Sequence, residues 1–222
     1  MNAADLREGE NREVPIPVEH DQIYGDLTLV PASTGLVLFA HGSGSSRHSS
    51  RNRRVAQVLN RAGISTLLFD LLTAQEDETD ILTREFRFDI ALLAKRLGLA
   101  TDWVQAQPPL ADQSVGYFGA STGAAAALTE AARRPDRIHA VVSRGGRADM
   151  ADEALERVQA PTLLIVGGRD DVVIDLNRQA LGQLHCTCKL EIVEGATHLF
   201  EEPGALEQVA DLAKDWFLRY LA

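Results

Sequence analysis

The chain contains very little sulfur. Its only cysteines are Cys186 and Cys188. They lie two positions apart in a segment that we expect to be a strand, so their side chains point to the same face, which is poor geometry for a disulfide between them. No cluster of further ligands with zinc-site spacing surrounds them in the sequence. We therefore expect two reduced structural thiols and no metal site.

An excess of positive charge and long apolar runs are also missing. The chain has 22 Lys and Arg against 32 Asp and Glu, a net charge of −10, which argues against a general nucleic-acid binder because phosphate contacts need a concentrated positive surface. No apolar run approaches the roughly 20 residues that span a membrane. Residues 1–12 are polar, without an apolar signal core. These absences predict a cytoplasmic protein with neither nucleic acid nor a membrane as a partner.

Strand-like and helix-like segments alternate along the chain. Residues 14–18 and 24–30 predict an antiparallel hairpin at a sheet edge. Six later segments have the character of strands, most of them buried on both faces: residues 36–40, 64–69, 115–118, 138–143, 161–166 and 189–193. Helices are expected near residues 55–62, 84–105, after Ser121, and near 150–158, 176–184 and 205–220, with an acidic loop at 75–80.

This alternation predicts an α/β fold, a doubly wound and mostly parallel sheet with helices on both faces. The 222 residues and their 45% apolar content suit one domain covering residues 1–222, with residues 1–12 as a loose leader. Only 17 residues separate Ser143 from Pro161, too few for an inserted lid domain.

The most informative stretch is Gly119-Ala-Ser-Thr-Gly123, which lies between an apolar run and an alanine-rich run. That order predicts a strand, a tight turn and a helix, with Ser121 at the corner. Glycines two positions to either side leave room for so sharp a turn. A serine at a helix N-terminus is also surrounded by amide donors that favour developing negative charge. The pattern predicts a nucleophile; the alternative is a glycine-punctuated turn with an incidental serine.

An acid and a histidine follow two later predicted strands. Asp170 and Asp171 come shortly after residues 161–166, and His198 comes shortly after residues 189–193. Ligands of open α/β sheets bind beyond the carboxyl ends of the strands, so we expect Ser121, an acid and His198 to meet there. Asp170 is the preferred acid, because it holds the Gly-x-x-Asp position counted from Gly167.

Four segments together resemble the α/β-hydrolase superfamily, and within it the small, lidless dienelactone-hydrolase-like group. They are His41-Gly-Ser-Gly44, Gly119-Ala-Ser-Thr-Gly123, Gly167-Gly-Arg-Asp170 and Gly195-Ala-Thr-His198-Leu-Phe. The resemblance covers nearly the whole chain after about residue 30. Some relatives of this type resemble domains fused to phosphoribosyltransferases. The named dienelactone hydrolases use a cysteine nucleophile where this chain has Ser121, which weakens transfer of their substrate but not of ester-hydrolase chemistry.

The resemblance implies a serine hydrolase that cleaves a small ester or lactone through an acyl-enzyme, with no metal or organic cofactor. His198 would take the proton of Ser121, and Asp170 would fix the tautomer of His198. The backbone amides of Ser43 and Thr122 would form the oxyanion hole. A lyase or an acyltransferase can use the same fold and triad, and a non-catalytic binding module that retains the pocket is a third interpretation.

Arginines gather in two segments that follow predicted strands. Arg47, His48, Arg51, Arg53 and Arg54 come after the predicted oxyanion loop, and Arg144 and Arg147 come after residues 138–143. Most of them are expected to form a solvated basic surface. Arg47 and Arg144 lie closest in sequence to the loops of the site, so we expect one or both to hold a carboxylate or phosphate of a small anionic substrate.

Overall fold

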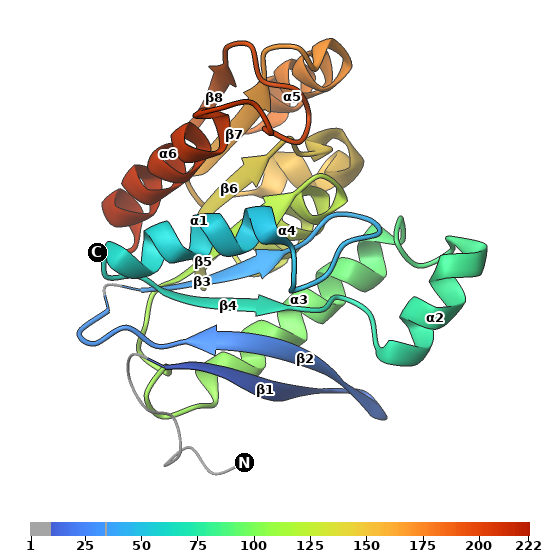
Figure 1. The fold of residues 1–222 in the computed structure, drawn as a ribbon, viewed down its shortest axis with the longest axis vertical. Coiled ribbons are helices and arrows are strands. Elements are labelled where there is room, and N and C mark those ends of the chain that lie inside the picture. The colour runs from blue at the N-terminus through green and yellow to red at the C-terminus, as the bar shows by residue number, and fades with distance from the viewer. Residues whose placement is uncertain (1–9, 34) are drawn as a thin grey trace.

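The computed structural model describes residues 10–33 and 35–222, and it confirms the predicted α/β fold (Figure 1). The strands form one sheet of eight in the order β1-β2-β4-β3-β5-β6-β7-β8. The pairs from β4 to β8 are parallel, whereas β1 and β2 pair antiparallel at one edge. The strands are β1 (Asn11–Val18), β2 (Asp21–Thr28), β3 (Leu36–Ala40), β4 (Ser65–Phe69), β5 (Val115–Ala120), β6 (Ile138–Arg144), β7 (Thr162–Gly167) and β8 (Cys188–Val193).

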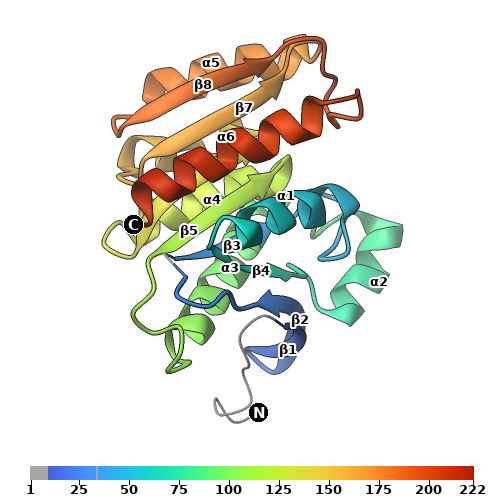
Figure 2. The same cartoon turned by 60° about the vertical axis from the view of Figure 1, so that its left-hand side comes forward.

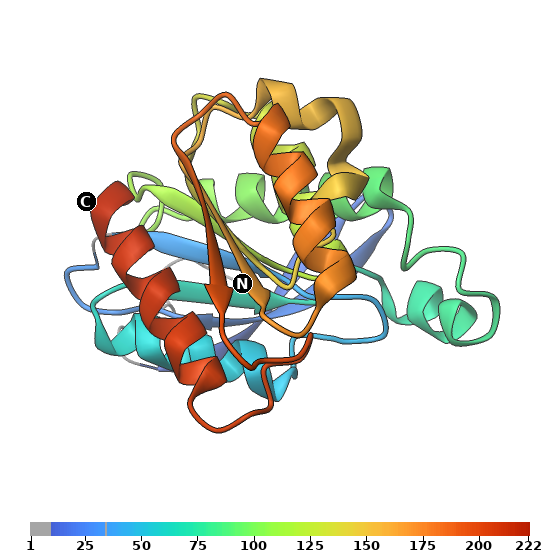
Figure 3. The same cartoon turned by 90° about the horizontal axis from the view of Figure 1, so that it is seen from above.

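Helices cover both faces of this sheet, and each face has its own core (Figures 2 and 3). On one face, α1 (Ser50–Arg61) and α6 (Ala205–Tyr220) pack through apolar residues such as Leu59 and Phe217. The other face carries α3 (Ile90–Gln105), α4 (Thr122–Arg133), the 3₁₀ helix η2 (Ala148–Arg157) and α5 (Asp171–Gln183). Every residue of β3, β4, β5 and β7 is buried, as expected for parallel strands covered on both faces. None of the helices in residues 10–33 and 35–222 has the length and apolar character needed to cross a membrane.

The edge hairpin is confirmed, but the predicted leader is too long. Asn11 and Arg12 already belong to β1, where they pair with Thr28 and Leu27. The wrong boundary has a simple cause: Asn11 and Arg12 are polar because this edge strand is partly exposed, so apolar alternation becomes visible only from Val14. Residues 1–9 of the predicted leader lie outside the described residues.

The predicted acidic loop at residues 75–80 is wrong, because these residues belong to helix α2 (Ala74–Thr83). A capping box starts the helix: Thr73 accepts a hydrogen bond from the Glu76 amide, and the Glu76 side chain accepts one from the Thr73 amide. The helix ends at Arg84, in the left-handed conformation with φ 60°. The helix predicted at 84–105 therefore begins later in the chain than predicted, at Ile90, and Asp89 caps it. In Figure 1, α2 projects beyond the sheet.

The capping box gives a stability prediction for α2. Thr73→Ala removes an acceptor at a buried helix start and should lower the free energy of unfolding by about 1 kcal/mol, measured by chemical denaturation. Thr79→Ala is the matched control, since Thr79 lies inside the same helix and its hydroxyl only donates a hydrogen bond to the Gln75 carbonyl. Equal losses in the two variants would contradict the capping role of Thr73.

Candidate active site

Ser121 occupies the turn between β5 and α4, and its backbone is strained. Its φ of 50° and ψ of −121° belong to a region that residues other than glycine rarely adopt. A Cβ on Gly119 would lie 2.4 Å from the Ala124 Cα, and one on Gly123 would lie 2.2 Å from the Ala40 carbonyl oxygen. Both positions therefore require glycine, as expected for an elbow that holds a serine at the end of a strand.

The neighbouring strand fixes the elbow through backbone hydrogen bonds. The Ser121 amide donates to the Arg144 carbonyl at 3.2 Å, and the Ser121 carbonyl accepts from the Arg147 amide at 3.0 Å. Both partners lie at or just beyond the carboxyl end of β6. Strain at Ser121 can persist because these contacts and the packing of the glycines determine the local conformation.

His198 and Asp170 form a direct hydrogen bond from neighbouring loops. The distance between His198 Nδ1 and Asp170 Oδ2 is 2.6 Å. Asp171, one residue further along, is exposed in the first turn of α5. Gly167 lets the two loops approach, since a Cβ there would lie 2.5 Å from the Ala196 carbonyl oxygen. The structure therefore brings His198 to Asp170 and leaves Asp171 in solvent.

The histidine loop reaches the end of β6 beside the elbow. The His198 ring packs on Gly145, where a Cβ would lie 3.4 Å from Nδ1 and Cε1 of the ring. Phe200, which is fully buried, anchors this loop in the core under α6. In the described part of the chain no hydrogen bond joins Ser121 Oγ to His198. Such bonds are often long or open in the absence of substrate and tighten when it binds.

The two residues predicted to form the oxyanion hole contact each other. The Ser43 amide donates to Thr122 Oγ1 at 2.9 Å, so this amide already has an acceptor. The loop lies close to the nucleophile, because a Cβ on Gly42 would lie 3.1 Å from the Ser121 Cβ. A cavity of about 20 Å³, room for about one water molecule, is lined by Ser43 and Thr122 together with Arg87 of the loop before α3.

His41 holds the start of this loop in place. Its Nε2 accepts from the Leu71 amide at 3.1 Å, so the ring proton lies on Nδ1, which donates to the Gly42 carbonyl at 2.9 Å. Burial lowers the pKa of His41, which keeps the ring neutral as this pair of bonds requires. The sequence pattern placed His41 in the loop but carried no signal of its partner Leu71, just after β4, because the contact depends on the tertiary fold.

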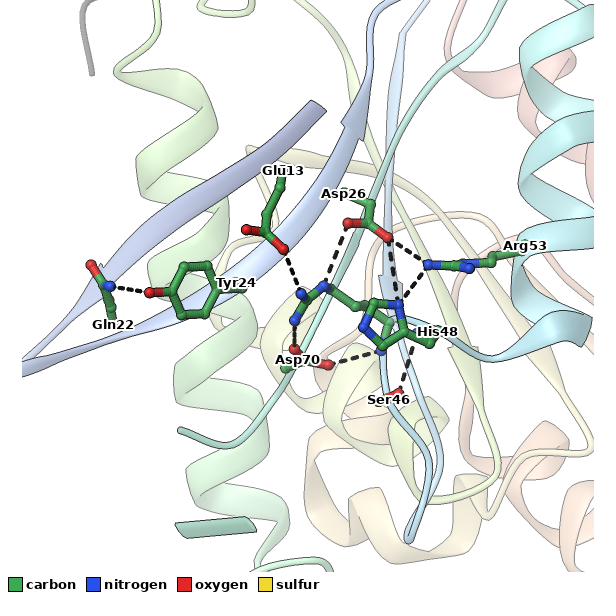
Figure 4. A network of polar contacts seen from close by, with 9 residues as sticks. Glu13, Gln22, Tyr24, Asp26, Ser46, His48, Arg53 and Asp70 are labelled. Atoms are coloured by element: carbon green, nitrogen blue, oxygen red, sulfur yellow. Dashed lines mark hydrogen bonds and ion pairs between the residues drawn. The ribbon is translucent and has the colours of Figure 1, made fainter. Parts of the chain in front are cut away.

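Arg47, one of the two predicted anion-binding arginines, is already paired with acidic side chains. Its guanidinium contacts Asp70, lies 2.7 Å from Glu13 and 3.4 Å from Asp26, and stacks over the ring of Tyr24. Figure 4 shows the three carboxylates close together: Glu13 comes from β1, Asp26 from β2, and Asp70 from the residue that follows β4. These carboxylates already neutralise the guanidinium of Arg47, which argues against its binding an anionic substrate.

Arg144 has the opposite surroundings. Its side chain is buried, with the residue only 7% exposed, and in residues 10–33 and 35–222 no carboxylate lies within ion-pair distance. Burial lowers the pKa of Arg144 to about 10, and the nearby charge of Arg51 adds to this effect. The guanidinium nevertheless stays charged near neutral pH. Of the two predicted arginines, this is the one whose charge is uncompensated.

The comparison with protein families identifies a clear similarity. Residues 31–221 match the model of the dienelactone hydrolase family. The chain is 56% identical over 221 residues to a protein named "Putative phosphoribosyl transferase" in two strains of Mycobacterium tuberculosis. The match includes 99% of this chain but 48% of those proteins, so the chain spans about half the length of the curated relatives it matches.

Solved structures agree with this assignment. A dienelactone hydrolase from Anabaena variabilis is 55% identical, with a TM-score of 0.95 over 97% of this chain and 100% of that one. Est1E from Butyrivibrio proteoclasticus has a TM-score of 0.78 over 93% of this chain and 98% of that one, at 16% identity. The second similarity concerns the fold alone.

The buried state of His41 predicts a pH dependence of stability. Its folded-state pKa lies below the unfolded value of about 6.5, so protons bind preferentially to the unfolded chain and stability is lost as pH falls below about 6.5. One such proton contributes a slope of up to about 1.4 kcal/mol per pH unit. His41→Gln should show a shallower slope in denaturation between pH 8 and 5. Identical slopes would show that His41 is not the group responsible.

Proposed function

The chain belongs to the dienelactone hydrolase family, and from that membership we propose that it is a serine hydrolase that cleaves a small ester or lactone. The observation that carries the proposal is the hydrogen bond between His198 and Asp170. It forms beside a serine on a strained elbow, and all three residues follow the carboxyl ends of parallel strands. We do not extend the phosphoribosyl transferase name of the curated relatives to this chain, because it spans about half of their length.

In the proposed first step, Ser121 Oγ attacks the carbonyl carbon of the ester and its proton passes to His198 Nε2. Asp170 supports this transfer, because a carboxylate on Nδ1 holds the tautomer whose Nε2 is free to accept a proton. The same carboxylate stabilises the imidazolium that forms. The tetrahedral intermediate then collapses, the carbon–oxygen bond to the leaving group breaks, and the leaving alcohol takes the proton from His198.

The negative charge of the intermediate needs donors at the elbow. We assign this role to the backbone amides of Thr122 and Ser43, the first at the N-terminus of α4 and the second in the adjacent loop. The Ser43 amide would exchange Thr122 Oγ1 for the oxyanion during the reaction. Water then attacks the acyl-enzyme with His198 as general base, which releases the acid and restores Ser121. This cycle uses side chains, backbone amides and water alone.

The nucleophile is tested by covalent labelling. Ser121→Ala should abolish labelling by a fluorophosphonate and reduce kcat for 4-nitrophenyl esters by about 10⁶-fold, as expected when a triad loses its nucleophile. Ser114→Ala is a matched control, because Ser114 lies just before the opposite end of β5. Labelling of the Ser121 variant at the wild-type rate would remove serine catalysis from the proposal.

The acid is tested by a pair of adjacent substitutions. Asp170→Asn should lower kcat by about 10⁴-fold, because an amide on Nδ1 favours the wrong imidazole tautomer. Asp171→Asn changes an exposed carboxylate of the same charge and should have a far smaller effect. Circular dichroism of both variants checks the fold. Equal losses, or a larger loss in the Asp171 variant, would show that Asp170 is not the acid of the triad.

A further inference from the structure

The Arg144 side chain, whose charge has no acidic partner in the described residues, reaches the first turn of α1. Arg144 Nη2 donates to the side-chain oxygen of Asn52 at 3.3 Å, and Asn52 is itself buried in the first turn of that helix. Arg144 Nε is buried and has no hydrogen-bond partner in the described part of the chain. Burying an unpaired charge is costly, and an unsatisfied donor adds to that cost. A ligand that supplies negative charge would remove both costs.

A second arginine, Arg51, stands next to Asn52 in the first turn of α1. The positive charge of Arg51 contributes to the lowered pKa of Arg144. Arg51 Nε is also buried without a partner in residues 10–33 and 35–222. Its ion pair with Glu201 is long, 3.4 Å, and the Glu201 side chain is 66% exposed. Arg51 precedes Asn52, the residue to which Arg144 donates, so both arginine side chains lie at the start of α1, and their only acidic partner in the described part of the chain is the exposed Glu201.

The other arginines of the same two segments are compensated. Each has an acidic partner within 4 Å: Arg47 with Glu13, Asp26 and Asp70, Arg53 with Asp26, Arg54 with Glu207, and Arg147 with Asp149. Within these two segments of the described chain, only Arg144 has no acidic partner, and only Arg51 relies on a single long pair with an exposed carboxylate.

Arg144 adjoins the proposed catalytic residues. The Arg144 carbonyl accepts from the Ser121 amide, and the next residue, Gly145, carries the His198 ring against its backbone. Glu201, the partner of Arg51, lies three residues after His198. The side chain of Arg51 is 31% exposed, so the site reaches solvent on that side. The backbone of Arg144 therefore contacts the serine elbow, while its side chain contacts the first turn of α1.

We propose that Arg144, Arg51 and the first turn of α1 bind a phosphate monoester group carried by the substrate, an inference that rests on the proposed hydrolase function. A phosphate monoester carries close to two negative charges at neutral pH, which matches two guanidinium groups better than the single charge of a carboxylate does. Helix N-termini bind phosphate through free amide groups and the helix dipole. The Ser49 hydroxyl caps α1 by accepting a hydrogen bond from the Asn52 amide at 3.3 Å, and no acidic residue stands in the first turn, so the helix start carries no negative charge of its own.

Binding is tested with inorganic phosphate by isothermal titration calorimetry, in the wild type and in Ser121→Ala. Arg51→Gln and Arg144→Gln should each weaken phosphate binding by roughly 10- to 150-fold, the effect of one lost charge-assisted contact. Arg54→Gln is the matched control, because Arg54 lies on the same helix, is exposed and pairs with exposed Glu207. It should change affinity by about twofold or less. Arg51 is partly exposed, so its variant tests the site even if Arg144→Gln does not fold.

Three 4-nitrophenyl esters test whether the bound phosphate is a group of the substrate or a free ion. The esters have equal chain length and end in a phosphate monoester, a carboxylate or a methyl ether. The wild type should have its highest kcat/KM with the phosphate ester. Arg51→Gln and Arg144→Gln should lower the ratio of kcat/KM for the phosphate ester to that for the ether by roughly 10- to 150-fold. Arg54→Gln should keep the wild-type ratio.

The outcomes separate the alternatives. Phosphate binding with the expected mutational pattern but no preference among the esters would assign the site to free phosphate and overturn its assignment to the substrate. A preference for the carboxylate ester, or an equal effect of Arg54→Gln, would overturn the phosphate site itself. If no ester is cleaved while phosphate binding retains the expected pattern, the proposed hydrolase function fails and the anion site stands.

Discussion

The candidate active site depends on backbone segments that approach more closely than any side chain allows. Gly123 brings α4 against the Ala40 carbonyl at the end of β3, and Gly167 brings the acid loop against the histidine loop. A single Cβ at either glycine would lie within about 2.5 Å of a carbonyl oxygen, at 2.2 Å and 2.5 Å respectively. These contacts bring the strained serine, the bonded histidine and the loop of Ser43 together at the carboxyl ends of the parallel strands. Helices packed on both faces of the sheet support these strand ends.

Two arginines near these strand ends have opposite electrostatic surroundings. On the side of β1, β2 and β4, three carboxylates surround Arg47 and fix the loop that follows the Ser43 amide (Figure 4). On the side of β6, Arg144 is buried without such partners. The compensated Arg47 holds its loop in position, whereas the charge of Arg144 is left without an acidic partner in the described part of the chain. A sequence pattern places both arginines after strands but does not distinguish these two situations.

Sequence patterns predicted the parts of the structure that depend on local chemistry. Buried parallel strands have continuous apolar runs, and Gly119 and Gly123 enclose the elbow, so both were visible in one sequence. Helix α2 was missed because its surface is polar and only its capping box, Thr73 with Glu76, marks its start. The partners of His41 and Arg47 lie far from them in the sequence, so no local pattern predicts them. Tertiary contacts therefore decided which polar residues support the site.

The bond between the Ser43 amide and Thr122 Oγ1 links the resting protein to the proposed chemistry. An amide left without an acceptor in this loop would cost about 1–3 kcal/mol, and the threonine hydroxyl avoids that cost in the absence of substrate. A charged oxygen is a stronger acceptor than a neutral hydroxyl, by roughly a factor of two. Exchanging one for the other therefore favours the state in which the negative charge has developed over the state that precedes it. A donor that is satisfied at rest and better satisfied in the transition state contributes to rate rather than only to binding.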